Sequence, residues 1–215
     1  MTLYRMTPAE LDYLQQLARS YNYELCKCNR PRYLDPILPM SPDLSEKFKH
    51  CSYDTPTPFA VTIPPKEGVI TYSPMNGATY GISDNFTGCM MAQFKCNAQS
   101  YIAHIYLDRK TPSYDTRNVW NDFIDNCCRS NQDPKAPHFS DFVMFKPSDV
   151  FGMDYLVQYY KLDGCFFGII DSYMNCYTGI LYKPKLRFAE LKTETHPIKV
   201  LGPINSLNAD PLKIH

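Results

Sequence analysis

A cysteine and a histidine in the middle of the chain have the types and spacing that nucleophilic catalysis needs. Cys89 directly follows Gly88 at the end of a polar turn, and His104 lies 15 residues further on. A cysteine at the start of a strand exposes its sulfur to substrate, and backbone N–H groups there can form an oxyanion hole. An imidazole on the neighbouring strand can act as the base, because a thiolate–imidazolium pair activates the sulfur.

The same two residues also have a purely structural interpretation. Cysteine is among the most buried residue types, and a histidine inside an apolar strand is more often a hydrogen-bonded core residue than a base. Spacing alone does not decide between these roles, because a nucleophile and its base are defined by their geometry. Asp84 and Asn85, which precede Cys89, are equally typical of an ordinary turn.

The residues around Cys89 resemble the signature of a toxin family. Phe86-Thr87-Gly88-Cys89 is similar to the Leu-Ser-Gly-Cys turn of the bacterial glutamine deamidase toxins of the cytotoxic necrotizing factor and Burkholderia lethal factor type. The strand with His104, a proline-containing loop and a helix with Trp120 continue the likeness to the lethal factor over about residues 80–125.

This resemblance implies a reaction and a set of residues. Cys89 would attack the side-chain carboxamide of a glutamine on a target protein, His104 would be the base, and water would release glutamate from the thioester. The family orients its histidine with a backbone carbonyl, for which the main chain of Ser83 is the candidate here. The residues that would support the turn and the oxyanion hole, together with the Cys89 N–H, are Thr87, Gly88 and Asn85.

The resemblance implies a protein substrate and no metal or organic cofactor. Rho-type GTPases and a translation initiation helicase are targets within the family. Other reactions of a Cys–His pair stay open, because transglutaminases, amidases and proteases pass through a similar acyl-enzyme. A non-enzymatic binding protein, in which Cys89 and His104 are packing residues, stays open as well.

Composition predicts a folded protein without a general attraction to polyanions. In 215 residues, 22 Lys and Arg balance 22 Asp and Glu, which argues against binding to nucleic acid or to an anionic membrane. The hydrophobic content of 44% excludes a disordered chain. The nine cysteines are an odd number, and neither Cys26 and Cys28 nor Cys127 and Cys128 have zinc-site spacing, so we expect no metal.

The sequence also predicts where the protein is made. It starts without the basic and apolar regions of a Sec signal, and it contains no apolar run long enough to span a membrane. We therefore expect synthesis in the cytoplasm and no membrane span. The toxin hypothesis adds delivery to the cytosol of a host cell.

The elements that must position Cys89 and His104 are predicted to form one α+β domain over 1–215, with a mixed or antiparallel β-sandwich-like core flanked by two main helices. Capping residues predict a helix over about 8–25, and an apolar stripe predicts another over 113–130. Residues 1–58 comprise the first helix and a proline-rich surface wrap with one helical turn after Ser41. Residues 59–182 form the sheet core, and 183–215 form a C-terminal extension. Strands are predicted at 59–63, 69–72, 79–82, 89–94, 101–107 and 142–145, followed by a short helix or turn near 148–157 and a hairpin of 165–170 with 177–182.

Overall fold

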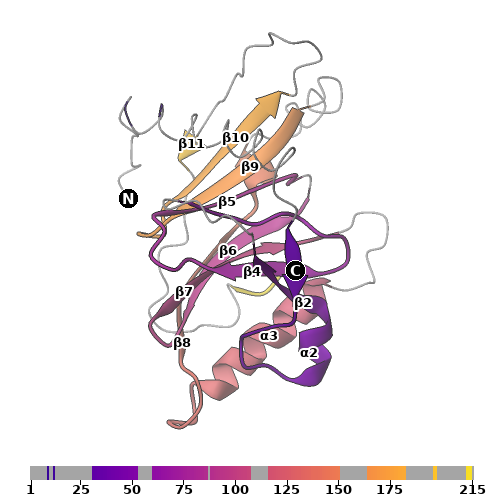
Figure 1. Cartoon of the computed structure of the whole chain (residues 1–215), viewed down its shortest axis with the longest axis vertical. Helices are drawn as coiled ribbons and strands as arrows, with labels where there is room; N and C mark the ends of the chain where they lie inside the picture. Colours follow the sequence, from indigo (N-terminus) through magenta and orange to yellow (C-terminus); the bar gives the residue numbers. More distant parts are fainter. Residues whose placement is uncertain are drawn as a thin grey trace.

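The strands of this protein form two mixed sheets (Figure 1). The computed structural model describes residues 9, 12, 31–52, 60–86, 88–107, 116–150, 164–182, 196–197 and 212–214. Sheet A has the strand order β1 (Arg32–Leu34), β2 (Phe48–Ser52), β4 (Ile70–Pro74), β7 (Gln99–Ile105), β6 (Met90–Cys96) and β8 (Phe139–Phe145). Sheet B has the order β11 (His196–Pro197), β10 (Cys176–Tyr182), β9 (Gly164–Asp171), β5 (Tyr80–Asp84) and β3 (Ala60–Thr62).

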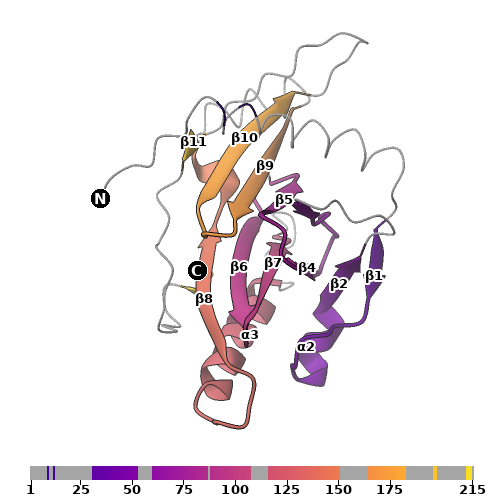
Figure 2. The same cartoon turned by 60° about the vertical axis from the view of Figure 1, so that its left-hand side comes forward.

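Two helices cover one face of sheet A (Figures 1 and 2). They are α2 (Pro42–Lys47) and α3 (Thr116–Ser130), and a short 3-10 helix, η1 (Pro147–Val150), follows β8. The apolar stripe of α3 buries Trp120, Phe123 and Cys127 against a cluster of aromatic side chains on the strands, including Phe94 and Phe142. Burial of this stripe is what holds an amphipathic helix on a sheet.

A tight hairpin sets the register of β6 and β7. Cys96 pairs with Gln99, so only two residues connect the strands, and the first of them, Asn97, has a φ of 48°. Asparagine tolerates this left-handed conformation, which two-residue hairpin turns require. The register that follows pairs Met91 with His104. A slip by one residue would turn His104 to the opposite face of the sheet.

The second face of sheet A packs against sheet B, and two glycines allow the sheets to approach closely. A Cβ atom on Gly81 of β5 would lie 2.6 Å from Ile102 Cγ1, and one on Gly168 of β9 would lie 2.9 Å from Met91 Sδ. Both positions therefore exclude any larger residue without rearrangement. The apolar side chains buried between the sheets form a cluster: Ile63, Met75, Phe86, Cys89, Met91, Ile102, Val143, Phe145, Ile170, Met174 and Cys176.

The α+β class and the mixed sheets agree with the sequence prediction. The predicted strands of the sheet core, the 113–130 helix and the 165–182 hairpin are present with small shifts of their ends. The prediction for residues 29–58 was wrong in one respect, because β1 and β2 of this segment pair with each other and β2 joins β4 in parallel. The predicted helix over 8–25 falls outside the described residues, except for Ala9 and Asp12, which are helical. Most of 183–215 also falls outside them.

Candidate active site

Cys89 and His104 lie on the same face of sheet A, the face that meets sheet B. Cys89 directly precedes β6, and His104 on β7 is the partner of Met91. Because side chains alternate along a strand, Cys89 and Met91 point to the same side as His104. Cys89 is therefore the diagonal neighbour of His104, an arrangement that places Cα atoms about 7–8 Å apart and brings long side chains within reach. The sequence predicted a cross-strand or diagonal pair, and the register gives the diagonal one.

His104 is held by a hydrogen-bonded chain that crosses between the two sheets. Its Nδ1 lies 2.8 Å from Ser83 Oγ on β5, and the Ser83 hydroxyl donates to the main-chain oxygen of Ile63. Thr71 of β4, the other strand partner of His104, donates to the next carbonyl, that of Pro64, at 2.8 Å. The segment after β3 is thus held by two hydroxyl groups, one of which also contacts the imidazole. We expected Ser83 to orient the histidine through its main chain, whereas the contact in the structure is made by its side chain.

These hydrogen bonds determine which ring nitrogen of His104 carries the proton. Ser83 Oγ has one hydrogen, which it donates to Ile63, so it must accept the hydrogen of Nδ1. The neutral imidazole then has its lone pair on Nε2. Nε2 is buried and has no hydrogen-bond partner among the residues that the structure describes. The chain Ile63–Ser83–His104 leaves the ring with a lone pair for accepting a proton.

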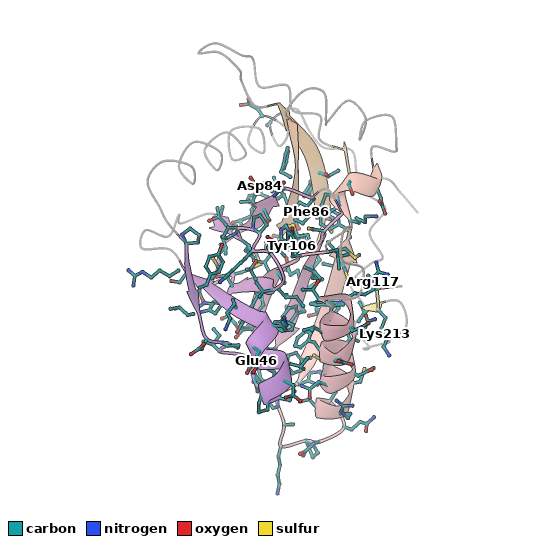
Figure 3. The ribbon with its side chains drawn as sticks, turned by 90° about the vertical axis from the view of Figure 1, so that its right-hand side faces the viewer. Glu46, Asp84, Phe86, Tyr106, Arg117 and Lys213 are labelled. Carbon is teal, nitrogen blue, oxygen red and sulfur yellow. The ribbon has the colours of Figure 1, made fainter. Side chains whose placement is uncertain are left out.

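Burial keeps this imidazole neutral. His104 is 0% exposed, and desolvation lowers its pKa from 6.5 to about 3. The ring of Phe86 covers it in a stacked arrangement, with ring centroids 4.3 Å apart and an interplanar angle of 17°. Phe86 comes from the end of β5, close to the end of β7 where Tyr106 follows (Figure 3). The stacked ring therefore fixes the imidazole plane and covers one of its faces.

The Cys89 sulfur receives a main-chain hydrogen bond. The N–H of Leu107, just after β7, donates to Cys89 Sγ at 3.4 Å, while the Leu107 carbonyl lies 4.0 Å from the same atom. A backbone N–H aimed at sulfur is of the kind that stabilises developing negative charge. Cys89 is 2% exposed, so the sulfur is enclosed in this structure.

The remaining predicted residues belong to the turn between β5 and β6. Asn85 is exposed and has a φ of 64°, the left-handed conformation of a turn residue, so it acts here through its backbone shape. Gly88 is buried directly beside Cys89. Thr87 lies outside the described residues. The turn therefore links the end of β5, which carries Ser83, to the start of β6, which follows Cys89 directly.

Sequence reasoning missed three contributors to this site: the Ile63 carbonyl, the Leu107 N–H and the side chain of Ser83. The first two act through the main chain, so their residue types carry no signal. Ser83 had one, since it is a hydroxyl residue in an apolar run that ends two residues later at a turn. Its partner on the other sheet could not be read from the sequence.

Comparisons with known proteins leave the site to be judged on its own geometry. No family model, no curated protein and no solved structure matches the chain.

Within the described ranges, no three His, Cys, Asp or Glu side chains gather where they could hold a metal ion. In the same part of the chain, no helix has the length and apolarity needed to cross a bilayer.

Proposed function

We propose that this protein is a thiol-dependent protein glutamine deamidase, which converts a glutamine side chain of a target protein to glutamate. The observation that carries the proposal is the hydrogen-bonded chain from Ile63 through Ser83 to His104, which leaves Nε2 of His104 to accept a proton on the strand that pairs with the Cys89 end of β6. A nucleophile, a base and a group that orients the base are the three parts of such a site.

The reaction would proceed in two steps. The Cys89 thiol gives its proton to Nε2 of His104, and the sulfur bonds to the carboxamide carbon of the substrate. The carbon–nitrogen bond then breaks, and the proton on Nε2 passes to the leaving nitrogen, which departs as ammonia. In the second step, water gives a proton to Nε2 and attacks the thioester, which releases the glutamate side chain and restores the thiol.

The reaction requires the site to open, because Cys89 and His104 are both buried. The most direct route is a displacement of the Phe86 ring from the imidazole, at the turn where Asn85 already adopts a left-handed backbone. Opening would also hydrate the imidazole and raise its pKa from about 3 toward its ordinary value, where it is a more effective base.

The burial of both residues also favours the second candidate, a protein without enzymatic activity in which they only pack. In that case the thiol would have no more reactivity than Cys176, a cysteine buried between the same sheets whose pKa burial raises. Alkylation of the folded protein, read at each cysteine by peptide mass spectrometry, separates the two candidates. A catalytic Cys89 is alkylated faster than Cys176 near neutral pH.

The decisive experiment is a search for the product. Lysate proteins of eukaryotic cells are incubated with the wild type or with Cys89→Ala and analysed by peptide mass spectrometry for glutamines that gain about 1 Da, the difference between carboxamide and carboxylate. Rho-type GTPases and translation initiation helicases are the first substrates to inspect. Cys176→Ala is the matched control, because it removes a buried thiol from the same cluster and should leave the activity intact.

Each outcome has a definite meaning. A glutamine modified by the wild type and Cys176→Ala but not by Cys89→Ala supports the deamidase. If Cys89 is selectively alkylated but no glutamine gains mass, transglutaminase and protease assays follow. In those reactions the acyl-enzyme forms from another bond or passes its acyl group to an acceptor other than water. If Cys89 is as inert as Cys176 and no product forms, the packing interpretation holds.

A further inference from the structure

Helix α3 holds a short segment that lies about ninety residues away in the sequence. The indole N–H of Trp120 donates to the Leu212 carbonyl at 2.9 Å. Leu212 and Ile214 are 1% and 7% exposed and belong to the core cluster between α3 and sheet A. Lys213, between them, lies beside α3 at the surface of this layer (Figure 3). Leu212 has helical backbone and Lys213 lies in a bend, and this arrangement buries the side chains of Leu212 and Ile214 while that of Lys213 stays half-buried.

The helix recognises the main chain of this segment as well as its side chains. The side-chain amide of Asn121 donates to the Ile214 carbonyl at 3.1 Å and accepts the Ile214 N–H at 2.8 Å, so one amide satisfies both backbone groups of one residue. One helical turn further on, Asp125 binds Lys213, with Oδ1 2.9 Å and Oδ2 3.2 Å from Nζ. All the polar groups that the helix offers here come from its side chains.

We propose that α3 and the adjoining core form a docking site for a short peptide of the pattern apolar–Lys–apolar, and that residues 212–214 of this chain are its occupant. Trp120 and Asn121 read the peptide backbone, the core receives the two apolar side chains, and Asp125 selects the cation between them. None of these contacts depends on covalent continuity with the rest of the chain. The site is independent of the Cys89 chemistry.

The single tryptophan of the chain gives a direct measurement. In the full-length double variant Leu212→Asp, Ile214→Asp, the segment should leave the helix, and solvent exchange of the Trp120 indole N–H, followed by NMR, should rise at least tenfold. A peptide with the sequence of residues 210–215 should then restore protection at about millimolar concentration, the usual effective concentration of a tethered segment. The wild type should not respond, because its own segment occupies the site.

Controls on the same helix test the assigned contacts. Adding Asn121→Ala to the double variant should abolish the response to the peptide, while Asn118→Ala, at an exposed position of α3, should preserve it. The proposal is overturned if the double variant keeps its indole protection, if a folded double variant ignores the peptide, or if Asn121→Ala binds equally well. If the wild type responds to the peptide only as a dimer, a second copy of the chain supplies the segment. That result would overturn docking within one chain.

A second set of variants applies if the double variant does not fold. Lys213→Glu in the otherwise wild-type chain should raise indole exchange about threefold, the scale of a partly exposed ion pair, and adding Asp125→Lys should reverse it. Equal indole exchange rates in Lys213→Glu, in Lys213→Glu with Asp125→Lys and in the wild type would refute the role of Asp125. The proposed apolar–Lys–apolar pattern would fall with it.

Discussion

Lowering the pH should destabilise this protein through His104, in a way that can be calculated from its burial. Desolvation lowers the pKa of the folded imidazole from 6.5 to about 3, whereas the unfolded chain keeps the ordinary value. Between these two values the unfolded state binds a proton that the folded state does not. The stability that His104 contributes is therefore complete above pH 6.5 and is lost as the pH falls toward 3.

The size of the effect follows from the linkage between proton binding and unfolding. Each pH unit inside this window lowers the free energy of unfolding by about 1.4 kcal/mol. A change from pH 8 to pH 5 covers about 1.5 units below the unfolded pKa of 6.5, so His104 should account for a loss of about 2 kcal/mol. This is a large part of the stability of an ordinary domain.

Urea unfolding of the wild type and of His104→Asn at both pH values isolates this contribution. Asparagine keeps an N–H donor near the position of Nδ1, facing Ser83, but does not titrate. The wild type should lose about 2 kcal/mol more than the variant between pH 8 and pH 5, while losses from all other groups cancel. His138→Asn, at an exposed loop position, should behave as the wild type. Equal losses for the wild type and His104→Asn would show that the folded imidazole reaches water or an acceptor, and the argument for a neutral, enclosed base would fail.

Three further predictions concern the groups around the imidazole. Ser83→Ala removes the partner of His104 and of the Ile63 carbonyl, so unfolding assays should show a loss of about 1–3 kcal/mol; deamidation should fall roughly 10- to 100-fold because the tautomer is no longer fixed. An unchanged rate in a folded Ser83→Ala protein would remove Ser83 from the mechanism. Gly168→Ala should lower the free energy of unfolding by about 1–3 kcal/mol, because the new methyl group meets the opposing sheet; an unchanged urea midpoint would contradict the close approach. Phe86→Ala uncovers His104, so alkylation of Cys89 should accelerate about tenfold in peptide mass spectrometry, with a buried control thiol unaffected. Unchanged alkylation would mean that Phe86 does not close the site.

The half of the site that depends on one hairpin was predictable from the sequence. The sequence predicts the two strands, at 89–94 and 101–107, and their pairing as a hairpin, but it leaves the cross-strand and the diagonal arrangement open. The two-residue turn at Asn97 and Ala98 fixes the register that makes Cys89 and His104 diagonal neighbours. The strands of residues 29–58 were not predictable in the same way. β2 is short, lies among prolines and pairs in parallel with β4, so its conformation is decided by a partner that follows it by some twenty residues.

The other half of the site depends on how the two sheets meet, which no local pattern encodes. Ser83 reaches His104 only because β5 and β9 approach sheet A at Gly81 and Gly168, where side chains would hold the sheets apart. The sequence shows both glycines, but a glycine in a strand is equally compatible with a bulge or a turn. Their role became visible only when the opposing Ile102 and Met91 side chains were in place.

The polarity of this inter-sheet layer is itself an argument about function. An imidazole at position 104 costs the fold its desolvation, and Nε2 adds the cost of a buried acceptor that no described residue satisfies, on the order of 1–3 kcal/mol. An apolar side chain of similar volume would pack between Phe86 and Met91 without either cost. The Ser83 hydroxyl and the Ile63 carbonyl nevertheless fix the orientation of the Nε2 lone pair. An arrangement that is ordered but costs folding stability is the kind expected at functional sites. This cost supports the proposal that His104 is a base held in a closed state, and the alkylation and product assays decide between that proposal and a packing role.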